Sequence, residues 1–144
     1  SSSTIVMAAL GTLTAASLAL TACGIFDRHS VSTEEGWSTW SAEAVQSASS
    51  AGRPVFIDFT AAWCITCQAN KLAVLDREEV VSRMSALGYV RFLADWTNKD
   101  PAITKELAKY GRTGVPLYVL IYKDGTVKVL PELLTTGTVL DALK

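Results

Sequence analysis

Residues 56–68 decide the fold of this chain, and they read Phe-Ile-Asp-Phe-Thr-Ala-Ala-Trp-Cys-Ile-Thr-Cys-Gln. The first part continues Val55 as a short apolar run, which is typical of a strand buried on both faces of a sheet. A Cys-x-x-Cys motif, Cys64 to Cys67, comes just past the end of that strand, where a helix is expected to begin. Open α/β sheets place their chemistry at this edge, so we expect the functional site here.

The spacing of the two cysteines suits reversible disulfide chemistry. Positions three apart lie on one face of a helix with Cβ atoms about 5–6 Å apart, so Cys64 and Cys67 can close a disulfide with little backbone movement. Cys64 is expected at the helix start, where free backbone amides and the helix dipole favour a thiolate. We therefore predict that Cys64 is the nucleophile and that the more shielded Cys67 is the resolving thiol.

Asp58 is an acid inside the apolar run. Burial of a carboxylate is costly, so this side chain should be either paired or protonated at neutral pH. Asp58 lies six residues before Cys64, and it could accept the proton of Cys67 during exchange, directly or through water. The alternative is that Asp58 faces a solvated edge or caps a turn.

Four short motifs, taken together, resemble one known family. The chain resembles a thioredoxin-fold domain and, more narrowly, the C-terminal periplasmic domain of the DsbD/ScsB family of membrane thiol-disulfide reductases. The similarity covers about residues 37 to 144. The motifs that carry it are Phe-Thr-Ala-Ala-Trp-Cys at 59–64, Ala-Asp-Trp-Thr-Asn at 94–98, Gly-Val-Pro-Leu-Tyr at 114–118 and Val-Leu-Pro-Glu-Leu-Leu at 129–134.

This resemblance implies roles for residues around the cysteines. In thioredoxin-fold proteins the proline at the place of Pro116 is cis and packs against the cysteine pair, and the backbone before it pairs with bound peptide. Val115 and Pro116 are therefore assigned to substrate contact, together with Trp63, Ile65 and Thr66 beside the thiols. The resemblance further implies a membrane-embedded, DsbD-like core that passes electrons to this domain, whose reduced pair then reduces a second extracytoplasmic domain or a disulfide-containing client. The redox centre would be the disulfide itself, with no other cofactor and no metal.

The remaining pattern predicts a thioredoxin-like α/β fold with a mixed sheet of four strands, or slightly more, flanked by helices. Asp76 to Glu79 resembles a capping box at a helix start, and Asp-Pro at 100–101 starts another helix. Trp37 and Trp40 are expected to pack the first helix onto the sheet, and Trp96 is a possible rim residue of the site. The predicted strands are 55–59, 89–94, 117–122 and 126–130, and the predicted helices are 41–51, 64–75, 76–86, 100–110 and 138–143.

The N-terminal residues form a separate compositional block. No charged residue occurs before Asp27, and Ile5 to Ala22 is apolar, near the short end of the about 20 residues of a membrane span. Residues 1–26 are thus predicted to be either a transmembrane helix or a signal whose Leu-Thr-Ala-Cys at 20–23 resembles a lipoprotein processing site. Residues 27–39 are predicted to be a tether and 40–144 the thioredoxin-like domain. Either reading places the domain outside the cytoplasm and ties it to a membrane. The resemblance implies that this is the bacterial inner membrane, with the catalytic domain facing the periplasm.

Composition narrows the functional classes. The net charge is −1, from 13 basic and 14 acidic residues, so no basic surface for nucleic acid is expected. Three cysteines are too few for a disulfide framework, which leaves the spaced pair for redox work. The leading hypothesis is a membrane-tethered protein-disulfide reductase. The alternatives are a Cu(I)-binding module, because two thiolates suit a soft ion, and a thioredoxin-like lipoprotein that binds or oxidises clients.

Overall fold

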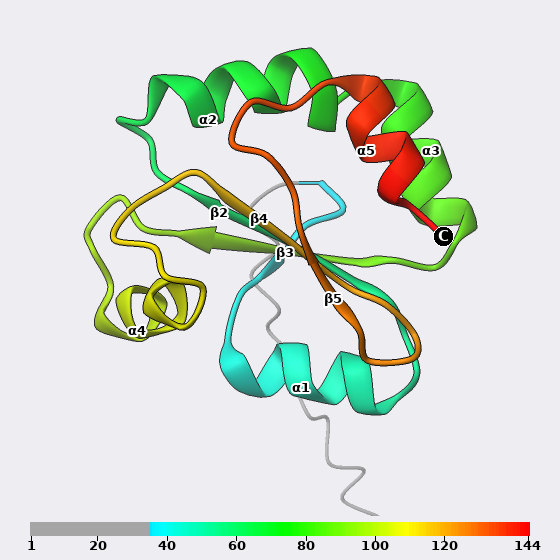
Figure 1. The fold of residues 1–144 in the computed structure, drawn as a ribbon, viewed down its shortest axis with the longest axis horizontal. Helices are drawn as coiled ribbons and strands as arrows, with labels where there is room; N and C mark the ends of the chain where they lie inside the picture. Colours follow the sequence, from blue (N-terminus) through cyan, green and yellow to red (C-terminus); the bar gives the residue numbers. More distant parts are fainter. Residues whose placement is uncertain (1–34) are drawn as a thin grey trace, which may run out of the picture.

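The computed structural model describes residues 35–144, which form a mixed five-stranded sheet flanked by helices (Figure 1). The spatial order of the strands is β1-β3-β2-β4-β5. Strands β1, β2 and β3 run parallel, whereas β4 is antiparallel to both β2 and β5. The strands are β1 (Ser38–Thr39), β2 (Val55–Thr60), β3 (Val90–Asp95), β4 (Leu117–Ile121) and β5 (Val127–Val129). The predicted thioredoxin-like α/β class is confirmed, with the sheet extended to five strands.

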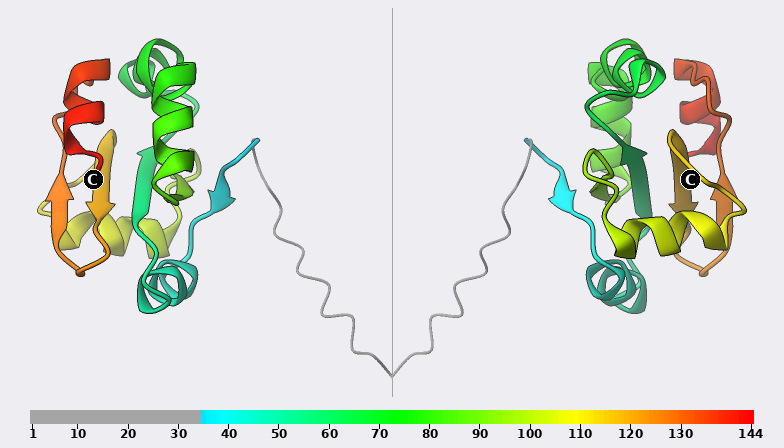
Figure 2. Two further views of the ribbon diagram at one scale, coloured as in Figure 1. Left: turned by 90° about the vertical axis from the view of Figure 1, so that its right-hand side faces the viewer. Right: turned by 90° about the vertical axis from the view of Figure 1, so that its left-hand side faces the viewer.

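Helices cover both faces of the sheet, and this explains why β2 is buried along its whole length. Helices α1 and α4 lie on one side of the sheet, and α2, α3 and α5 lie on the other (Figures 1 and 2). After α2 the chain continues as a short π-helical segment, η1, that leads toward α3. The bounds are α1 (Ala42–Ser50), α2 (Ile65–Asn70), η1 (Lys71–Leu75), α3 (Glu78–Ala86), α4 (Pro101–Lys109) and α5 (Thr136–Ala142).

Two hydrophobic cores follow from the alternation of side chains along β2. Ile57 and Phe59 pack with residues of α1 and α4, and Phe56 packs with residues of η1, α3 and α5. Asp58 has the same parity as Phe56, so its side chain belongs to the face that carries α2 and η1. Burial of large apolar side chains on both faces is the main stabilising contribution, at roughly 25 cal/mol per Å².

Helices α1 and α4 start close to their predicted positions, each with a side-chain cap. The side chain of Ser41 accepts from the N–H of Ala44, and the side chain of Asp100 accepts from the N–H groups of Ala102 and Ile103. The predicted capping box at Asp76 is wrong, because α3 begins one residue later with Arg77 as its N-cap and without a side-chain cap. The carboxylate of Asp76 instead accepts from Lys71 Nζ at 3.0 Å, so an ion pair replaces the cap.

The described fold begins before residue 40, inside the segment predicted to be a tether. Trp37 is buried, and Ser38–Thr39 forms the edge strand β1 beside β3. Trp40 packs with α1 as predicted, but Trp37 belongs to the core on the opposite face of the sheet. Side chains alternate between the two faces along an extended chain, and these two tryptophans are an odd number of residues apart. A two-residue strand is too short to show an alternating pattern in the sequence, which explains the difference.

The predicted anchor at residues 1–26 and the first part of the predicted tether lie outside the described residues. Across residues 35–144, none of the helices combines the length and the apolar character that crossing a membrane requires.

Candidate functional site

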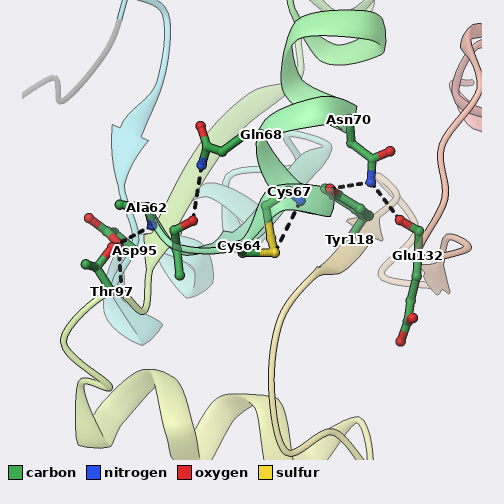
Figure 3. Close-up of a disulfide and its surroundings, with 10 residues drawn as sticks. Ala62, Cys64, Cys67, Gln68, Asn70, Asp95, Thr97, Tyr118 and Glu132 are labelled. Carbon is green, nitrogen blue, oxygen red and sulfur yellow. Dashed lines mark hydrogen bonds between the residues drawn. A yellow bond between two sulfur atoms is a disulfide. The ribbon is translucent and has the colours of Figure 1, made fainter.

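The redox pair lies where β2 passes into α2, at the edge that the sequence predicts. Cys64 is the N-cap residue of α2, and its Sγ is bonded to the Sγ of Cys67 with a Cα–Cα distance of 5.2 Å. The backbone N–H of Cys67 also donates to Cys64 Sγ at 3.2 Å (Figure 3). After reduction, this donor at the helix start favours the thiolate of Cys64 over its thiol.

The two sulfur-bearing residues differ in their access to solvent. Cys64 retains 8% of its surface, whereas Cys67 retains 2% and lies one helical turn inside. An incoming disulfide can therefore approach Cys64 more easily than Cys67. This asymmetry is what a nucleophilic thiol and a resolving thiol require.

The side chains beside Cys64 form an exposed apolar rim. Trp63 is 53% exposed and Ile65 is 85% exposed, while Thr66 is half-buried. The ring of Trp63 lies 6.0 Å, centroid to centroid, from the ring of Trp96. Trp96 itself is buried, and its Nε1 donates to Thr104 Oγ1. Trp96 therefore packs beneath the exposed ring of Trp63 and is not a rim residue.

Thr97 connects the loop before Cys64 to the end of β3, and the sequence did not single it out. Its Oγ1 accepts from the N–H of Ala62 at 2.9 Å, and its carbonyl oxygen accepts from Trp63 Nε1 at 3.1 Å. The carboxylate of Asp95 accepts from both the N–H and the Oγ1–H of Thr97 (Figure 3). An Asp side chain that accepts from the backbone two residues later is a recognisable turn pattern, and Asp95 with Thr97 could have been identified from the sequence in this way.

Val115 lies next to the pair, as the resemblance implies, and Pro116 follows it in the chain. Val115 is half-buried and packs against the small cluster of Ala61, Cys64 and Cys67. The Val115–Pro116 peptide bond is cis, as expected. The assignment of both residues to substrate contact stays a prediction.

Asp58 is buried, with 2% of its surface exposed, so the alternative of a solvated edge does not apply. In the sheet it lies opposite Leu93 of β3 and Tyr118 of β4. The side chain is thus on the face that carries the redox helix. Its role as proton acceptor stays a prediction.

A buried amide, Asn70, lies one turn beyond Cys67 and was missed in the sequence. Its Nδ2 donates to the hydroxyl oxygen of Tyr118 at 2.9 Å and to the carbonyl oxygen of Glu132 at 2.6 Å (Figure 3). Its Oδ1 accepts from the N–H of Leu134 at 3.1 Å. The spacing from Cys67 to Asn70 places both on one helix face, and that spacing was the signal that could have found it.

The surroundings of Tyr118 are apolar apart from this amide and Asp58. Burial raises the pKa of Tyr118 well above its ordinary value, the charge of Asp58 raises it further, and the hydrogen bond from Asn70 offsets only a part. Tyr118 is thus neutral throughout the physiological pH range.

Among residues 35–144, no group of three or more His, Cys, Asp and Glu side chains is placed to hold a metal ion. Cu(I) on two thiolates would need fewer ligands, so that alternative from the sequence stays untested.

Comparison with known proteins places this geometry in a family. A family model described as thioredoxin-like matches residues 36–123. The thiol:disulfide interchange protein DsbD 1 of Pseudomonas aeruginosa is 35% identical over 82 residues. That alignment covers 57% of this chain but only 13% of the relative, so the match corresponds to a small part of that protein.

Solved structures agree on the fold. The C-terminal domain of Neisseria meningitidis DsbD in its oxidised form has a TM-score of 0.58 at 23% identity, over 72% of this chain and 93% of that chain. A thioredoxin from Thermus thermophilus has a TM-score of 0.59 at 23% identity, over 74% of this chain and 82% of that chain.

The family match spans more than half of the chain, and the fold carries a disulfide at the tip of its active-site helix. This chain therefore belongs to the thioredoxin-like family, as an oxidoreductase whose redox pair is Cys64 and Cys67.

Proposed function

We propose that this chain is the extracytoplasmic relay domain of a DsbD-like protein-disulfide reductase anchored at the bacterial inner membrane. In this role it takes electrons from a membrane-embedded core and passes them to a partner domain or to a client disulfide. The observation that carries the proposal is the pair of unequal cysteines: Cys64 at the helix start is 8% exposed, and Cys67 behind it is 2% exposed. The similarity to DsbD 1, a thiol:disulfide interchange protein, supports the exchange chemistry, and the reductive direction is part of the proposal.

The reaction is a balanced exchange in two steps. The Cys64 thiolate attacks one sulfur of the partner's disulfide, forms a mixed disulfide and releases the other partner sulfur as a thiolate. Cys67 then loses its proton and attacks Cys64 Sγ, which closes the Cys64–Cys67 disulfide and releases the second partner thiolate. The partner gains two electrons and this chain loses two.

Each neighbouring group has a place in these steps. The N–H of Cys67 stabilises the Cys64 thiolate before the first step, and the buried Asp58 takes the proton of Cys67 in the second. Trp63, Ile65, Thr66, Val115 and Pro116 would contact the partner around Cys64.

The test is to trap the intermediate with Cys67→Ala in the full chain, since the mixed disulfide on Cys64 then cannot be resolved. We expect the trapped protein to be one that carries its own cysteine pair. The control is Cys64→Ala with Cys67→Ala, which should trap nothing at this site.

A second measurement decides the direction of electron flow. At equilibrium with the glutathione couple, a reductase should hold its pair largely oxidised even when most of the glutathione is reduced, and it should reduce insulin disulfides. Capture of unselected unfolded proteins alone, or net oxidation of a reduced client, would contradict a dedicated reductive relay.

A further inference from the structure

Two segments that are distant in the sequence build the exchange site from opposite sides. Helix α2 carries Cys67, and β4 follows directly after the cis peptide bond at Pro116. The resolving step requires Cys67 to move its sulfur onto Cys64, so the position of α2 relative to β4 matters for that step.

The side-chain amide of Asn70 links α2 to β4. Both protons of its Nδ2 are donated in hydrogen bonds, one to Tyr118 and one to Glu132. Leu134 N–H can only donate and the Glu132 carbonyl can only accept, so these two neighbours fix which end of the amide is oxygen and which is nitrogen. The second Nδ2 proton is then directed to the hydroxyl oxygen of Tyr118, at 2.9 Å (Figure 3). The orientation of Asn70 is thus determined by two separate parts of the chain, β4 and the segment after β5.

Burial makes this connection strong. Asn70 has 5% of its surface exposed and Tyr118 has none, so neither group can exchange its partner for water without opening the core. Tyr118 is two residues beyond Pro116, and Asn70 is three residues beyond Cys67. The Asn70–Tyr118 hydrogen bond therefore ties the turn behind the resolving thiol to the strand behind the cis proline.

We propose that Asn70 and Tyr118 are positioning residues for the resolving step. Their hydrogen bond holds the turn of α2 that carries Cys67 in a fixed position relative to β4, the strand that follows Pro116. The proposal rests on the exchange function proposed above and adds to it. Both residues would act through the position of Cys67 and not by direct chemistry on the sulfurs. Loss of the bond should leave the attack of Cys64 unchanged and slow the attack of Cys67.

Both steps can be followed in one reaction with the small aromatic disulfide DTNB. Attack by Cys64 releases the first thionitrobenzoate anion and leaves the second on Cys64, and attack by Cys67 on Cys64 Sγ then releases the second. The full chain is used with Cys23→Ser, so that the third thiol does not react. Absorbance and acid-quenched mass spectra give the two rates separately.

Tyr118→Phe is the sharpest variant, because it removes the hydroxyl and leaves the other two bonds of Asn70 in place. Tyr122→Phe is its matched control. This buried tyrosine also follows Pro116 in the chain, but its hydroxyl donates to the carbonyl of Ala142 in α5 at 2.8 Å and not to a residue of α2. Asn70→Ala removes all three bonds, and far-UV circular dichroism checks that it folds.

We expect Tyr118→Phe to slow release of the second anion about 10-fold, within the range that small misplacements of reacting groups produce. The rate of the first release should match that of the parent chain, and Tyr122→Phe should change neither rate. An unchanged second rate in Tyr118→Phe, or equal slowing in Tyr122→Phe, would overturn the proposal. Absence of the first release in the parent chain would instead refute the exchange function itself.

Discussion

The indole Nε1 of Trp63 donates a hydrogen bond to the carbonyl oxygen of Thr97 at 3.1 Å, and this bond joins the residue before the nucleophile to the loop after β3. The same threonine accepts from the N–H of Ala62 through its Oγ1. The loop that leads to Cys64 is thus held from the side by one residue, and the large exposed surface of Trp63 is kept in a defined place.

Thr97→Val should loosen this loop while it preserves the shape of the side chain. The N–H of Ala62 loses its acceptor, and Asp95 loses one of its donors, so we expect a loss of about 1–2 kcal/mol in the free energy of unfolding. Urea unfolding measures the loss. Tryptophan fluorescence, with Trp63→Phe as the reference that isolates the signal of Trp63 among the four tryptophans, should report a more mobile ring. Thr97→Ser keeps the hydroxyl and should recover most of both properties, whereas failure of serine to do so would show that the hydroxyl is not the cause.

Ile65→Ser should weaken exchange with protein disulfides more than exchange with small ones. Ile65 is 85% exposed beside Cys64, so its removal costs contact area with a docking protein but no core packing. We expect kcat/KM for insulin reduction to fall several-fold, with the rate toward DTNB within a factor of about two. Val127→Ser is the matched control, since Val127 is an exposed apolar residue of β5. Equal losses toward both substrates would argue against a docking role.

Asp58→Asn should slow the attack of Cys67 on the mixed disulfide. The amide has nearly the same shape as the carboxyl group but cannot take up a proton at neutral pH, and general-base catalysis typically contributes about 10²–10⁴-fold. The second thionitrobenzoate release measures this step directly. Asp141→Asn, at an exposed position of α5, should leave the rate unchanged. A parent-like second rate in Asp58→Asn would remove Asp58 from the mechanism.

Stability should fall in alkaline solution, partly because of Tyr118. Burial, and then the charge of Asp58, raise the pKa of Tyr118 above its ordinary value of 10.0. The unfolded state therefore loses this proton first, so stability that is fully present below about pH 10 is lost as the pH rises toward the folded-state pKa. Urea midpoints across this range should fall less steeply in Tyr118→Phe than in the parent chain. Some slope should remain, because burial also raises the pKa of Tyr89, Tyr110 and Tyr122. Identical slopes in the two proteins would contradict the assignment.

Local sequence signals identified most elements and the redox pair. The Cys64–Cys67 spacing, the Asp-Pro helix start at 100–101 and the apolar run of β2 each depend on neighbours within a few residues, and all are present in the structure. The predicted capping box at Asp76 is absent from the structure, because a local pattern does not show which partner a side chain takes. Its carboxylate had two possible partners, and the ion pair with Lys71 prevailed over the backbone amide.

The strand β2, the start of α2 and the spacing of the two cysteines can be predicted from local pattern, because hydrophobic periodicity and residue spacing act over one or two turns of chain. The distant residues that support them depend on how the chain folds back on itself. Thr97 is held next to Ala62 by the parallel pairing of β2 and β3, and Asn70 meets Tyr118 and Glu132 because α2 packs over β4 and the loop after β5. These contacts depend on the sheet order, and no local pattern in the chain encodes that order.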